Sequence, residues 1–452
     1  MPGLDLAPFT GLRFDPARVS AVGSAVSPPY DTIDSGRHGL LERLDPHNVV
    51  RLVLPRPGVD GAPADGYRRA GQLLTSWRAD GALVPDAAPA IYVYQASDSA
   101  RHVLQRGLLG ALALAGRGEG AVLRHENTMP GPVADRLALR RATGADLEPL
   151  LLLYAGGGGL ATGTTDAVTR TAPVLDAVDS DGVRHQLWAL QDRAVIAAVG
   201  RDLAPRRALI ADGHHRWAAA EAAAVGLPDD HPARRHLVVL VDRERHAPSV
   251  AAIHRVVTGM AAEAALARLP RGWTVATGEA PLRLWWPAGP AAGVGLLPPS
   301  GGPVEEPTGD MPSHMPGSMP GRRVALPAAE TLWSSLPTAL LHEVLLPRWG
   351  VTELDVSYWH DAADARAATL TAGVSDASIT GMTQAAADKF AVLLAPVGPE
   401  VAEEVAALGR LLPRKTTSFS PKPVTGLVLR AFDIEPGYPG TTMPGPAQTG
   451  AT

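Results

Sequence analysis

The chain has 452 residues, with 41 Lys or Arg against 46 Asp or Glu, a formal net charge of −5, and no cysteine. This balance argues against a broad grip on nucleic acid or on an anionic membrane, because such a grip needs clustered positive charge. The lack of cysteine excludes disulfide scaffolds and thiolate zinc sites. The apolar share of 46% supplies a globular core, and the length predicts two or three domains.

The N-terminus, Met1-Pro2-Gly3-Leu4-Asp5, has no basic segment leading into an apolar stretch. No later run approaches the roughly 18 apolar residues of a membrane span, so a cytoplasmic protein with no membrane partner is expected. Arg is used heavily, whereas Lys occurs only at Lys389, Lys415 and Lys422. A position that keeps Lys in such a chain is a candidate for a specific role.

Residues 1–118 are predicted to form an N-terminal α/β module. It opens with a turn at Ser27-Pro28-Pro29-Tyr30-Asp31, where two prolines exclude helix and Asp31 can accept from nearby amides. Apolar runs and their spacing then predict strands at 49–54, 91–95 and 105–115 and an amphipathic helix at 67–78.

Residues 119–286 alternate between strand and helix patterns and are predicted to form the core. The expected strands are 150–154, which ends in the run Gly156-Gly157-Gly158-Gly159, 207–210 and 236–241, with an Ala-rich helix at 216–225. Such alternation favours a mixed or parallel sheet with crossover helices, and hence an α/β fold.

Residues 287–323 are crowded with Pro, Gly, Ser and Met, which predicts a flexible linker that cannot propagate helix or ladder. A C-terminal α/β region is expected over 324–435. Its predicted elements are helices at 332–346, 361–371 and 400–408 and a strand at 391–394. The tail, 436–452, is predicted to be disordered.

The sharpest local feature is Asp212-Gly213-His214-His215-Arg216-Trp217, between a strand and the Ala-rich helix. A helix start presents unsatisfied amides and therefore favours anions. His214, His215 and Arg216 add donors in the same turn, and Arg suits bidentate phosphate contact. The pattern favours a phosphate site.

Two alternatives stay open for this motif. Asp212 could simply cap the helix, with both histidines on the surface or in packing. A zinc site is less favourable, because adjacent histidines diverge by about 100° around a helix and cannot easily share one ion.

A second feature is Arg124-His125-Glu126-Asn127-Thr128, after the apolar Ala121-Val122-Leu123. A carboxylate at a strand end beside His and Arg suits a general base for a hydroxyl. On a strand, His125 and Glu126 would face opposite ways, so only one of them would enter a site. A solvated His-Glu pair is the alternative.

The third feature is Pro413-Arg414-Lys415-Thr416-Thr417-Ser418, with Lys422 close behind. An ammonium with neighbouring hydroxyls suits a carboxylate or a phosphate, and Arg does not replace it where point-charge geometry matters. The alternative is a basic, solvated loop, which fits Lys422 better than Lys415.

Segments from about residue 6 to 432 resemble, in order, the bacterial and archaeal family catalogued as domain of unknown function 1015. The matching segments are Pro28-Pro29-Tyr30-Asp31, Asp45-Pro46-His47-Asn48-Val49-Val50-Arg51, His125-Glu126-Asn127-Thr128, Asp181-Gly182-Val183-Arg184-His185, Ala211-Asp212-Gly213-His214-His215-Arg216, Ile253-His254-Arg255-Val256 and Pro421-Lys422-Pro423-Val424-Thr425-Gly426-Leu427-Val428.

The central motif is also similar to that of free serine kinases in the ParB and sulfiredoxin superfamily, which phosphorylate free serine. This resemblance implies a ParB/sulfiredoxin-like phosphate-binding core, with additional α/β modules, that uses ADP or ATP and Mg²⁺. It implies phosphate binding at Gly213, His214, His215 and Arg216 and catalytic roles for Glu126, His125 and Asp212. Lys415, Thr416, Thr417 and Trp217 would bind the small hydroxyl substrate. After Thr417 the chain continues Ser418-Phe419, where the kinases tend to place another polar group.

The implied reaction has Glu126 accepting the proton of a substrate hydroxyl as that oxygen attacks the terminal phosphoryl group, while Asp212 places Mg²⁺ or caps the helix. The rival class is a nucleotide-binding or slowly hydrolysing switch or docking protein without a small-molecule acceptor. DNA binding is disfavoured by the acidic charge and the lack of a basic recognition helix. Sulfinic acid reduction needs a cysteine, and the chain has none.

Overall fold

Two units make up the computed structural model, which describes residues 3–58, 61–114, 120–277, 279–291, 293–299, 328–370 and 388–436. Unit 1 comprises residues 1–249 and 419–452, and unit 2 comprises residues 250–418. The chain leaves unit 1 within β13 (Ser249–Ala252) and returns to it within β20 (Thr417–Ser420). Unit 2 is therefore an insertion between the body of unit 1 and its last segment.

A mixed sheet forms the centre of unit 1, with strands in the order β6-β11-β8-β12-β5-β4-β10-β9 and β1 beside β5. β12 runs parallel to β8 and antiparallel to β5, and β11 runs parallel to β6 and antiparallel to β8. The strands are β1 (Leu6–Ala7), β4 (Ile91–Ser97), β5 (Val103–Ala113), β6 (Val122–Leu123), β8 (Leu150–Tyr154), β9 (Leu175–Val178), β10 (Arg184–Leu190), β11 (Ala208–Asp212) and β12 (Arg235–Asp242). Two small ladders join β2 (Leu12–Phe14) to β3 (Leu83–Pro85) and β7 (Ala145–Asp146) to β21 (Arg430–Ala431).

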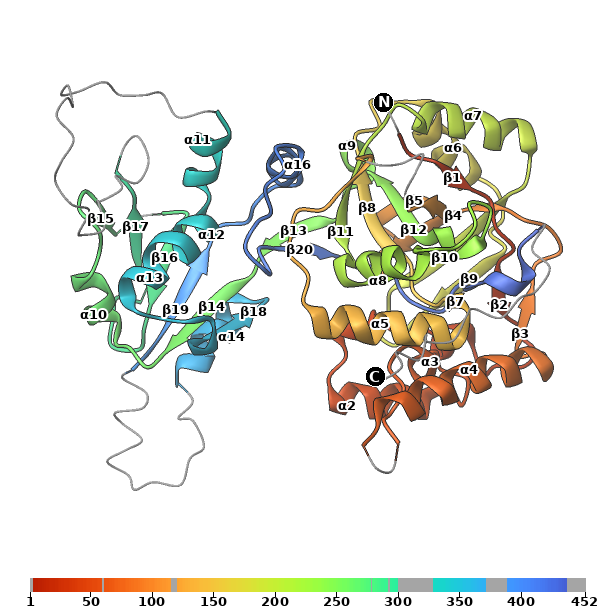
Figure 1. The fold of residues 1–452 in the computed structure, drawn as a ribbon, viewed down its shortest axis with the longest axis horizontal. Coiled ribbons are helices and arrows are strands. Elements are labelled where there is room, and N and C mark those ends of the chain that lie inside the picture. The colour runs from red at the N-terminus through yellow and green to blue at the C-terminus, as the bar shows by residue number, and fades with distance from the viewer. Residues whose placement is uncertain are drawn as a thin grey trace, which may run out of the picture. The chain divides into compact units, whose positions relative to one another are not determined.

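Helices accompany this sheet, and three of them stack in sequence: α8 packs on α5, and α5 packs on α4 (Figure 1). The helices of unit 1 are α1 (Val22–Ala25), α2 (Ser35–Leu44), α3 (Val50–Val53), α4 (Pro63–Ala79), α5 (Pro130–Thr143), α6 (Leu160–Val168), α7 (Arg193–Leu203), α8 (His214–Ala224) and α9 (Arg243–His246). Short 3₁₀ turns cover Tyr30–Thr32, Pro232–Arg234 and Phe432–Ile434. The start of α8 lies directly after β11, at the end of a fully buried strand.

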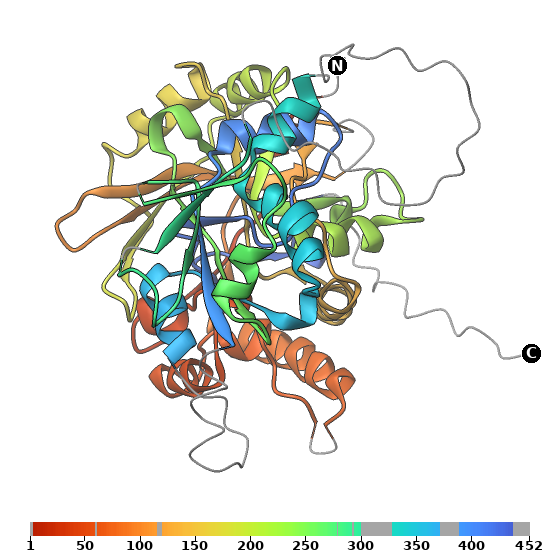
Figure 2. The same ribbon diagram turned by 90° about the vertical axis from the view of Figure 1, so that its left-hand side faces the viewer.

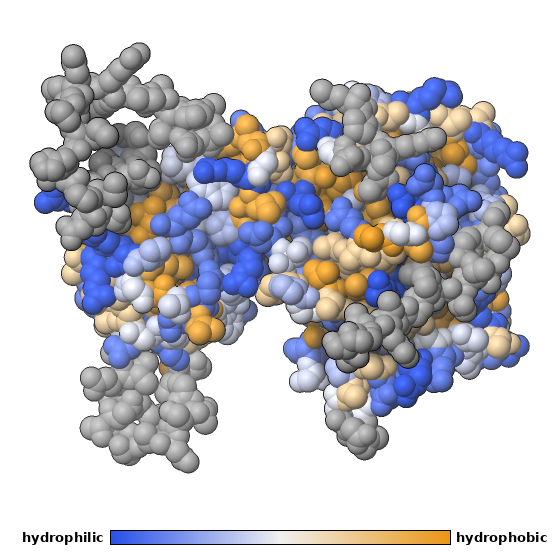
Figure 3. Space-filling model, viewed as in Figure 1, coloured by the Kyte–Doolittle hydropathy of each residue, from blue (hydrophilic) through white to orange (hydrophobic). Residues whose placement is uncertain are grey.

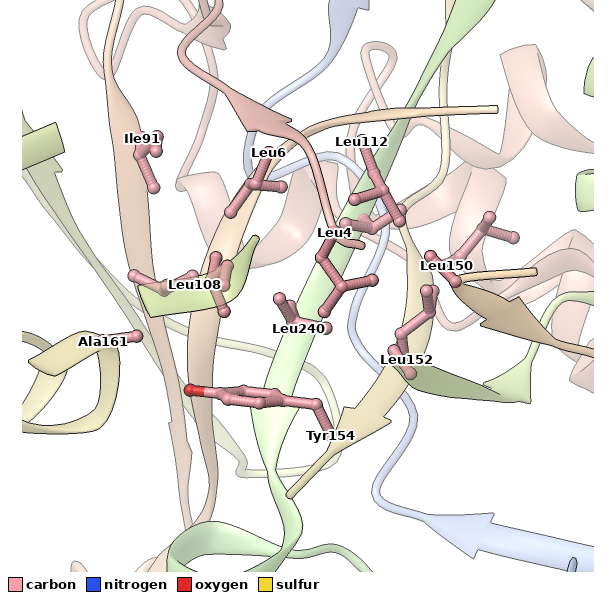
Figure 4. Packing of buried hydrophobic residues seen from close by; sticks show 14 of the residues in the cluster. Leu4, Leu6, Ile91, Leu108, Leu112, Leu150, Leu152, Tyr154, Ala161 and Leu240 are labelled. Carbon is pink, nitrogen blue, oxygen red and sulfur yellow. The ribbon is translucent and has the colours of Figure 1, made fainter. Parts of the chain in front are cut away.

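The core of unit 1 is built from apolar side chains of adjacent strands and of the first residues of the chain. At most 1% of the surface is exposed at Leu150 and Leu152 of β8 and at Leu240 of β12. The same cluster includes Leu4 and Leu6 (Figure 4). β8 is buried along its whole length, as a strand flanked on both sides in a sheet should be. This packing fixes the end of β11 and hence the position of the α8 start.

Unit 2 contains a second, antiparallel sheet in the order β15-β17-β16-β19-β14-β18, part of which faces the viewer in Figure 2. Its strands are β14 (His254–Thr258), β15 (Thr274–Ala276), β16 (Leu282–Trp285), β17 (Val294–Leu297), β18 (Val356–Trp359) and β19 (Lys389–Leu394). Its helical segments are α10 (Ala262–Ala267), α11 (Ala328–Ser335), α12 (Pro337–Ala339), a π-helical stretch (Leu340–Leu345), α13 (Leu346–Trp349), a 3₁₀ turn (Glu353–Asp355), α14 (Ala362–Leu370) and α16 (Pro399–Ala407). The Trp349 and Phe390 rings meet edge to face in its core.

The predicted mixed α/β class is confirmed, and so are most of the predicted elements. The run at 49–54 was wrongly expected to be a strand: it contains α3, because Asn48 Oδ1 accepts from the Val50 amide and begins a helical turn. An apolar run of this length cannot distinguish a buried strand from a buried helical turn. The predicted helix at 332–346 is interrupted at Pro337, which starts a new helix.

The domain organisation differs from the expected boundaries at 118, 286 and 323. β4 and β5, from the expected N-terminal module, hydrogen-bond within the same sheet as β8 and β12, so residues 1–118 are not a separate module. Within the expected linker 287–323, β17 forms a ladder strand because it pairs with both β15 and β16. Residues 300–327 and the predicted tail from 437 lie outside the described residues.

Hydrophilic and hydrophobic side chains are interspersed over the described face of the molecule in Figure 3. Across the described ranges, no helix combines the length and the apolar content that crossing a bilayer requires.

Candidate functional site

A sharp corner joins β11 to α8, and its geometry requires glycine. Gly213 has φ 101° and ψ 26°, in the left-handed region that favours glycine. A Cβ at this position would lie 2.2 Å from Leu150 Cδ2 of the adjacent strand. In the described structure no side chain caps α8, so its first amides are directed at the corner without a capping carboxylate. The alternative in which Asp212 caps the helix is therefore wrong, since Gly213 occupies the N-cap position.

Asp212 instead forms ion pairs with two side chains, one at each carboxylate oxygen. Lys422 Nζ lies 2.6 Å from Asp212 Oδ1, and Arg216 Nη2 pairs with Asp212 Oδ2. Arg216 is buried, and its Nη1 donates to the Pro149 carbonyl oxygen at 2.7 Å. These contacts hold the guanidinium at the corner through Nη1 and Nη2, whereas Nε makes no hydrogen bond within the described residues. The predicted phosphate contact of Arg216 stays a prediction.

Lys422 also approaches Asp31, with Nζ 3.4 and 3.5 Å from its two carboxylate oxygens. Its segment is anchored on both sides: Gln105 Nε2 donates to the Pro421 carbonyl at 3.0 Å, and the backbones of Ser27 and Thr425 exchange two hydrogen bonds. Burial lowers the pKa of Lys422, but Asp212 and Asp31 outweigh it and raise the pKa, so the amine stays charged. The alternative of a solvated Lys422 is wrong. The scarcity of Lys was the sequence signal for this residue.

Behind the corner, Glu148 extends the network of paired charges. Its Oε1 accepts from the Tyr30 amide at 3.0 Å, and its Oε2 lies 3.6 Å from Arg136 Nη1. The Arg136 guanidinium also lies 4.0 Å above the Tyr30 ring. Burial raises the pKa of Glu148, and the nearby Arg216 and Arg136 oppose that shift. Pro28-Pro29-Tyr30-Asp31 thus belongs to the same network as Asp212.

His214, the first residue of α8, has a buried ring nitrogen that makes no protein hydrogen bond in the described structure. The side chain is 9% exposed and Nε2 is buried, while the His125 ring packs edge-on at 4.7 Å. Burial, His125, His215, Arg124 and Lys422 hold the pKa of His214 well below its usual range, so the ring is neutral. Since buried polar atoms rarely lack a partner, Nε2 is a candidate for contact with a ligand or a water molecule.

His215 makes a contact that the sequence did not predict, and its phosphate contact stays a prediction. Its Nε2 accepts a hydrogen bond from the Met129 amide at 3.1 Å, so this nitrogen carries no proton to offer a phosphate. Met129 immediately precedes α5 and follows the segment that carries His125 and Glu126. His215 therefore fixes that segment against the start of α8.

His125 and Glu126 do not face opposite ways, contrary to the prediction for a strand. β6 ends at Leu123, and beyond it His125 Nε2 and Glu126 Oε1 lie 3.7 Å apart. His125 is fully buried between His214 and Phe419, and burial lowers its pKa against the effect of Glu126. The Glu126 side chain keeps 15% of its surface exposed, so this carboxylate can meet a ligand.

The predicted substrate residues are divided between core and turn. Trp217 is 2% exposed and packs in the core of unit 1, so the structure corrects its prediction as a substrate contact. Lys415, Thr416 and Thr417 belong to unit 2. Lys415 is exposed, whereas Thr416 is buried and its hydroxyl donates to the Pro413 carbonyl at 2.6 Å, which closes the turn.

Two other candidates for ion binding are already occupied by protein groups. In the run Gly156–Gly159, the Gly156 and Gly157 amides donate to Asp242 and Glu244, so this loop cradles carboxylates of its own chain. Among the described residues no group of three His, Asp or Glu could hold a metal ion. Asp212 does not fit as a Mg²⁺ ligand either, because Lys422 and Arg216 occupy both of its oxygens.

A small pocket, with room for about one water molecule, lies beside the network and shares Arg216 and Glu148 with it. Arg136, Arg140 and His236 also line this pocket. Arg140 Nε and Arg430 Nη1 hold the buried Asp146 at 2.8 and 3.1 Å. The cluster around Asp146 joins β7, α5 and β21, so it stabilises the fold next to the corner.

These features define a mixed α/β protein with a glycine corner, a buried unpaired histidine nitrogen and a lysine anchored over the helix start. Residues 6–316 match the model of the family described as protein of unknown function (DUF1015), which is more than half of the chain. The chain belongs to this family. The comparison with curated proteins found no matching relative.

Solved structures show remote likenesses. C-terminally truncated SbnI from Staphylococcus aureus is 13% identical, with a TM-score of 0.35 over 72% of this chain and 87% of that one. A mutant free serine kinase in complex with ADP is 15% identical, with a TM-score of 0.32 over 69% and 86%. A conserved hypothetical protein from Pyrococcus furiosus is 16% identical, with a TM-score of 0.31 over 70% and 93%.

Proposed function

We propose that the chain is a small-molecule kinase, which binds the phosphates of ADP or ATP at the Gly213 corner and transfers a phosphoryl group to the hydroxyl of a serine-like free amino acid. The observation that carries the proposal is the buried His214 Nε2, which has no hydrogen-bond partner among the described residues, at the start of a helix of eleven residues that follows Gly213. Amides at a helix start and a neutral imidazole N–H are both suited to phosphate oxygens.

Lys422 adds the positive charge in this proposal. An ammonium has three N–H donors, and Asp212 and Asp31 accept on two sides of it, which leaves a third for a phosphate oxygen. Arg216 would act indirectly, because it holds Asp212 and therefore Lys422 in place. The charges of Asp31, Asp212, Lys422 and Arg216 balance in the free protein, so binding depends mainly on the amides and His214.

Glu126 would be the general base. Its carboxylate lies beside His125, whose ring meets that of His214 edge to face, so the base and the phosphate site adjoin through these two rings. Glu126 would take the hydroxyl proton as the oxygen–phosphorus bond forms and the bond to the leaving nucleotide breaks. Asp212 does not fit the Mg²⁺ expected from the resemblance, because Lys422 and Arg216 occupy both of its carboxylate oxygens.

Lys415 and Thr417 are proposed to bind the carboxylate of the amino acid, since an exposed ammonium next to a hydroxyl matches that group. Thr416 is left out because its hydroxyl already closes the turn.

The test is to incubate the full chain with ADP or ATP, Mg²⁺ and a pool of free amino acids and hydroxy acids, and to analyse the products by mass spectrometry. A phosphorylated amino acid whose yield follows protein concentration supports the kinase. Saturable nucleotide binding without any phosphorylated product favours the nucleotide-binding switch and overturns the transfer reaction.

A further inference from the structure

Arg255, the second residue of β14, is a fully buried cation that donates hydrogen bonds to two backbone carbonyls and to a histidine ring. Its Nη1 donates to the Ile253 carbonyl at 2.5 Å, its Nη2 to the Arg414 carbonyl at 3.0 Å, and its Nε to His342 Nε2 at 3.2 Å. The guanidinium also lies 4.6 Å from the centre of the Tyr358 ring. A buried guanidinium is costly unless its N–H groups form hydrogen bonds. One of the hydrogen bonds of Arg255 goes to the backbone carbonyl of Arg414, directly before Lys415.

His342 connects Arg255 to an acid. Because its Nε2 accepts from Arg255, its proton lies on Nδ1, which faces Glu353 Oε1 at 3.0 Å. Burial and the neighbouring Arg255 lower the pKa of His342 to about 4, although Glu353 opposes the shift. The ring is therefore neutral near pH 7, and its two nitrogens connect the Glu353 carboxylate to the Arg255 guanidinium through hydrogen bonds.

Glu353 also contacts this turn, through the side chain of Arg414. Its Oε2 accepts from the Tyr358 hydroxyl at 2.6 Å and from Arg414 Nη2 at 3.1 Å. Arg414 is thus held twice, by its backbone oxygen through Arg255 and by its guanidinium through Glu353. All of these contacts lie within unit 2.

The residue that follows this double anchor is Lys415, with φ 54°. A lysine rarely adopts this left-handed conformation, so the surrounding contacts must hold it there. The Thr416 hydroxyl, bonded to the Pro413 carbonyl, closes the turn from the far side. The turn thus has a defined shape that presents an exposed lysine.

We propose that Arg255 is a positioning residue, which together with His342 and Glu353 holds the Arg414–Lys415 turn in the conformation that binds the carboxylate of the acceptor. This inference rests on the proposed function for the identity of the ligand, and on the contacts within unit 2 for the mechanism. Arg255 does not touch the substrate; it acts through the backbone of Arg414.

The test compares Arg255→Gln with Arg268→Gln in the full chain. Arg268 is the control for the loss of a hydrogen bond from a guanidinium to a backbone carbonyl, because it donates to that of Trp349 in the same unit, although Arg268 is exposed and Arg255 is buried. Hydrogen exchange of the amides at 412–417 should become at least tenfold faster in Arg255→Gln and stay unchanged in Arg268→Gln. The rate of amine labelling of Lys415, measured by mass spectrometry against Lys389 as internal reference, should change only in Arg255→Gln.

In the product assay, Arg255→Gln should raise KM for the amino acid about tenfold with KM for the nucleotide unchanged, and Arg255→Lys should restore part of the loss. If wild-type protein yields no product, the proposed function fails, while exchange and labelling still decide the role of Arg255. Unchanged exchange and labelling in Arg255→Gln would overturn the inference. If Arg255→Gln does not fold, Glu353→Gln is the second variant, because it leaves Arg255 in place. Exchange and labelling should then change in the same direction but by less, and no change in Glu353→Gln would also overturn the inference.

Discussion

Lys422 Nζ lies 2.6 Å from Asp212 Oδ1, which links the last segment of unit 1 to the corner that starts α8. Lys422→Met would leave Asp212, which is 7% exposed, with Arg216 as its remaining cationic partner among the described residues. We expect a loss of about 1.5–3 kcal/mol in the free energy of unfolding, because a buried carboxylate loses one of its two charged hydrogen-bond partners. Urea denaturation measures this loss, with Lys389→Met as a control that should change stability by less than about 0.5 kcal/mol. Equal effects of the two variants would contradict the importance of this pair.

Gly213→Ala should be far more costly than Gly226→Ala, although both glycines border the same helix and both have positive φ. Beyond Gly226 an added Cβ meets nothing within 4 Å, whereas at Gly213 it would lie 2.2 Å from Leu150 Cδ2. Gly226→Ala should cost about 1 kcal/mol from backbone strain, and Gly213→Ala about 2–5 kcal/mol from strain and overpacking together. The difference between the urea midpoints of the two variants measures the cost of the contact between the added Cβ and Leu150. A difference near zero would show that Leu150 moves aside at little cost.

Nucleotide binding should strengthen as pH falls from 8 to 6 and should take up protons. His214 is neutral in the free protein because burial and its cationic neighbours lower its pKa, and a bound phosphate would raise that pKa again. Titration calorimetry in buffers of different ionisation enthalpy measures the uptake. His214→Gln should weaken ADP binding about tenfold and remove the pH dependence. The exposed His102→Gln is the control; pH dependence that survives in His214→Gln would exclude His214 as its source.

Glu126→Gln should reduce phosphoryl transfer by about 10²–10⁴-fold, the range typical of a lost general base. Affinity for ADP should stay within about twofold, since the substitution changes neither the corner nor Lys422. Glu221→Gln, the same substitution on α8 at a residue that pairs with Arg124, should retain full turnover. Turnover of the two variants at saturating nucleotide is the measurement, and near-normal turnover in Glu126→Gln rejects the base assignment.

Acid should destabilise unit 1 through His236. Burial lowers the pKa of His236 to about 4, against the attraction of Asp146 and with the help of Arg140. A pKa that is lower in the folded than in the unfolded chain gives stability that is complete above about pH 6.5 and is lost as pH falls toward 4, by up to about 3 kcal/mol. His236→Asn, which can keep the hydrogen bond from Nδ1 to the Leu237 carbonyl, should flatten urea midpoints measured across this window. An unaltered slope would assign the acid sensitivity elsewhere.

The sequence predicted what depends on local pattern. The apolar run of β8, the short β11 and the Ala-rich α8 follow from periodicity and from Gly213, so the strand–glycine–helix corner was correctly expected. The prediction of a strand at 49–54 was wrong, because apolar side chains in this run are buried in a helical turn as they would be in a strand. Lys422 could be singled out by its rarity, but its partners Asp212 and Asp31 are distant in the chain.

The roles of the two adjacent histidines were also beyond reach of the local pattern. Both stand in the first turn of α8 and looked equivalent as phosphate donors. In the structure His215 accepts from the Met129 amide, a contact set by how α5 packs on α8, whereas His214 turns toward His125. Tertiary packing therefore gives the two rings different surroundings, which the local pattern could not show.

Binding of a nucleotide phosphate at the start of α8 is the central claim of the proposed function. Calorimetric titration of ADP into wild-type protein and His214→Ala, with His102→Ala as control, tests this most directly. We predict one saturable site in the wild type and in His102→Ala, with affinity at least tenfold weaker in His214→Ala. Absence of saturable binding in the wild type, or equal affinity in all three proteins, would contradict the phosphate site.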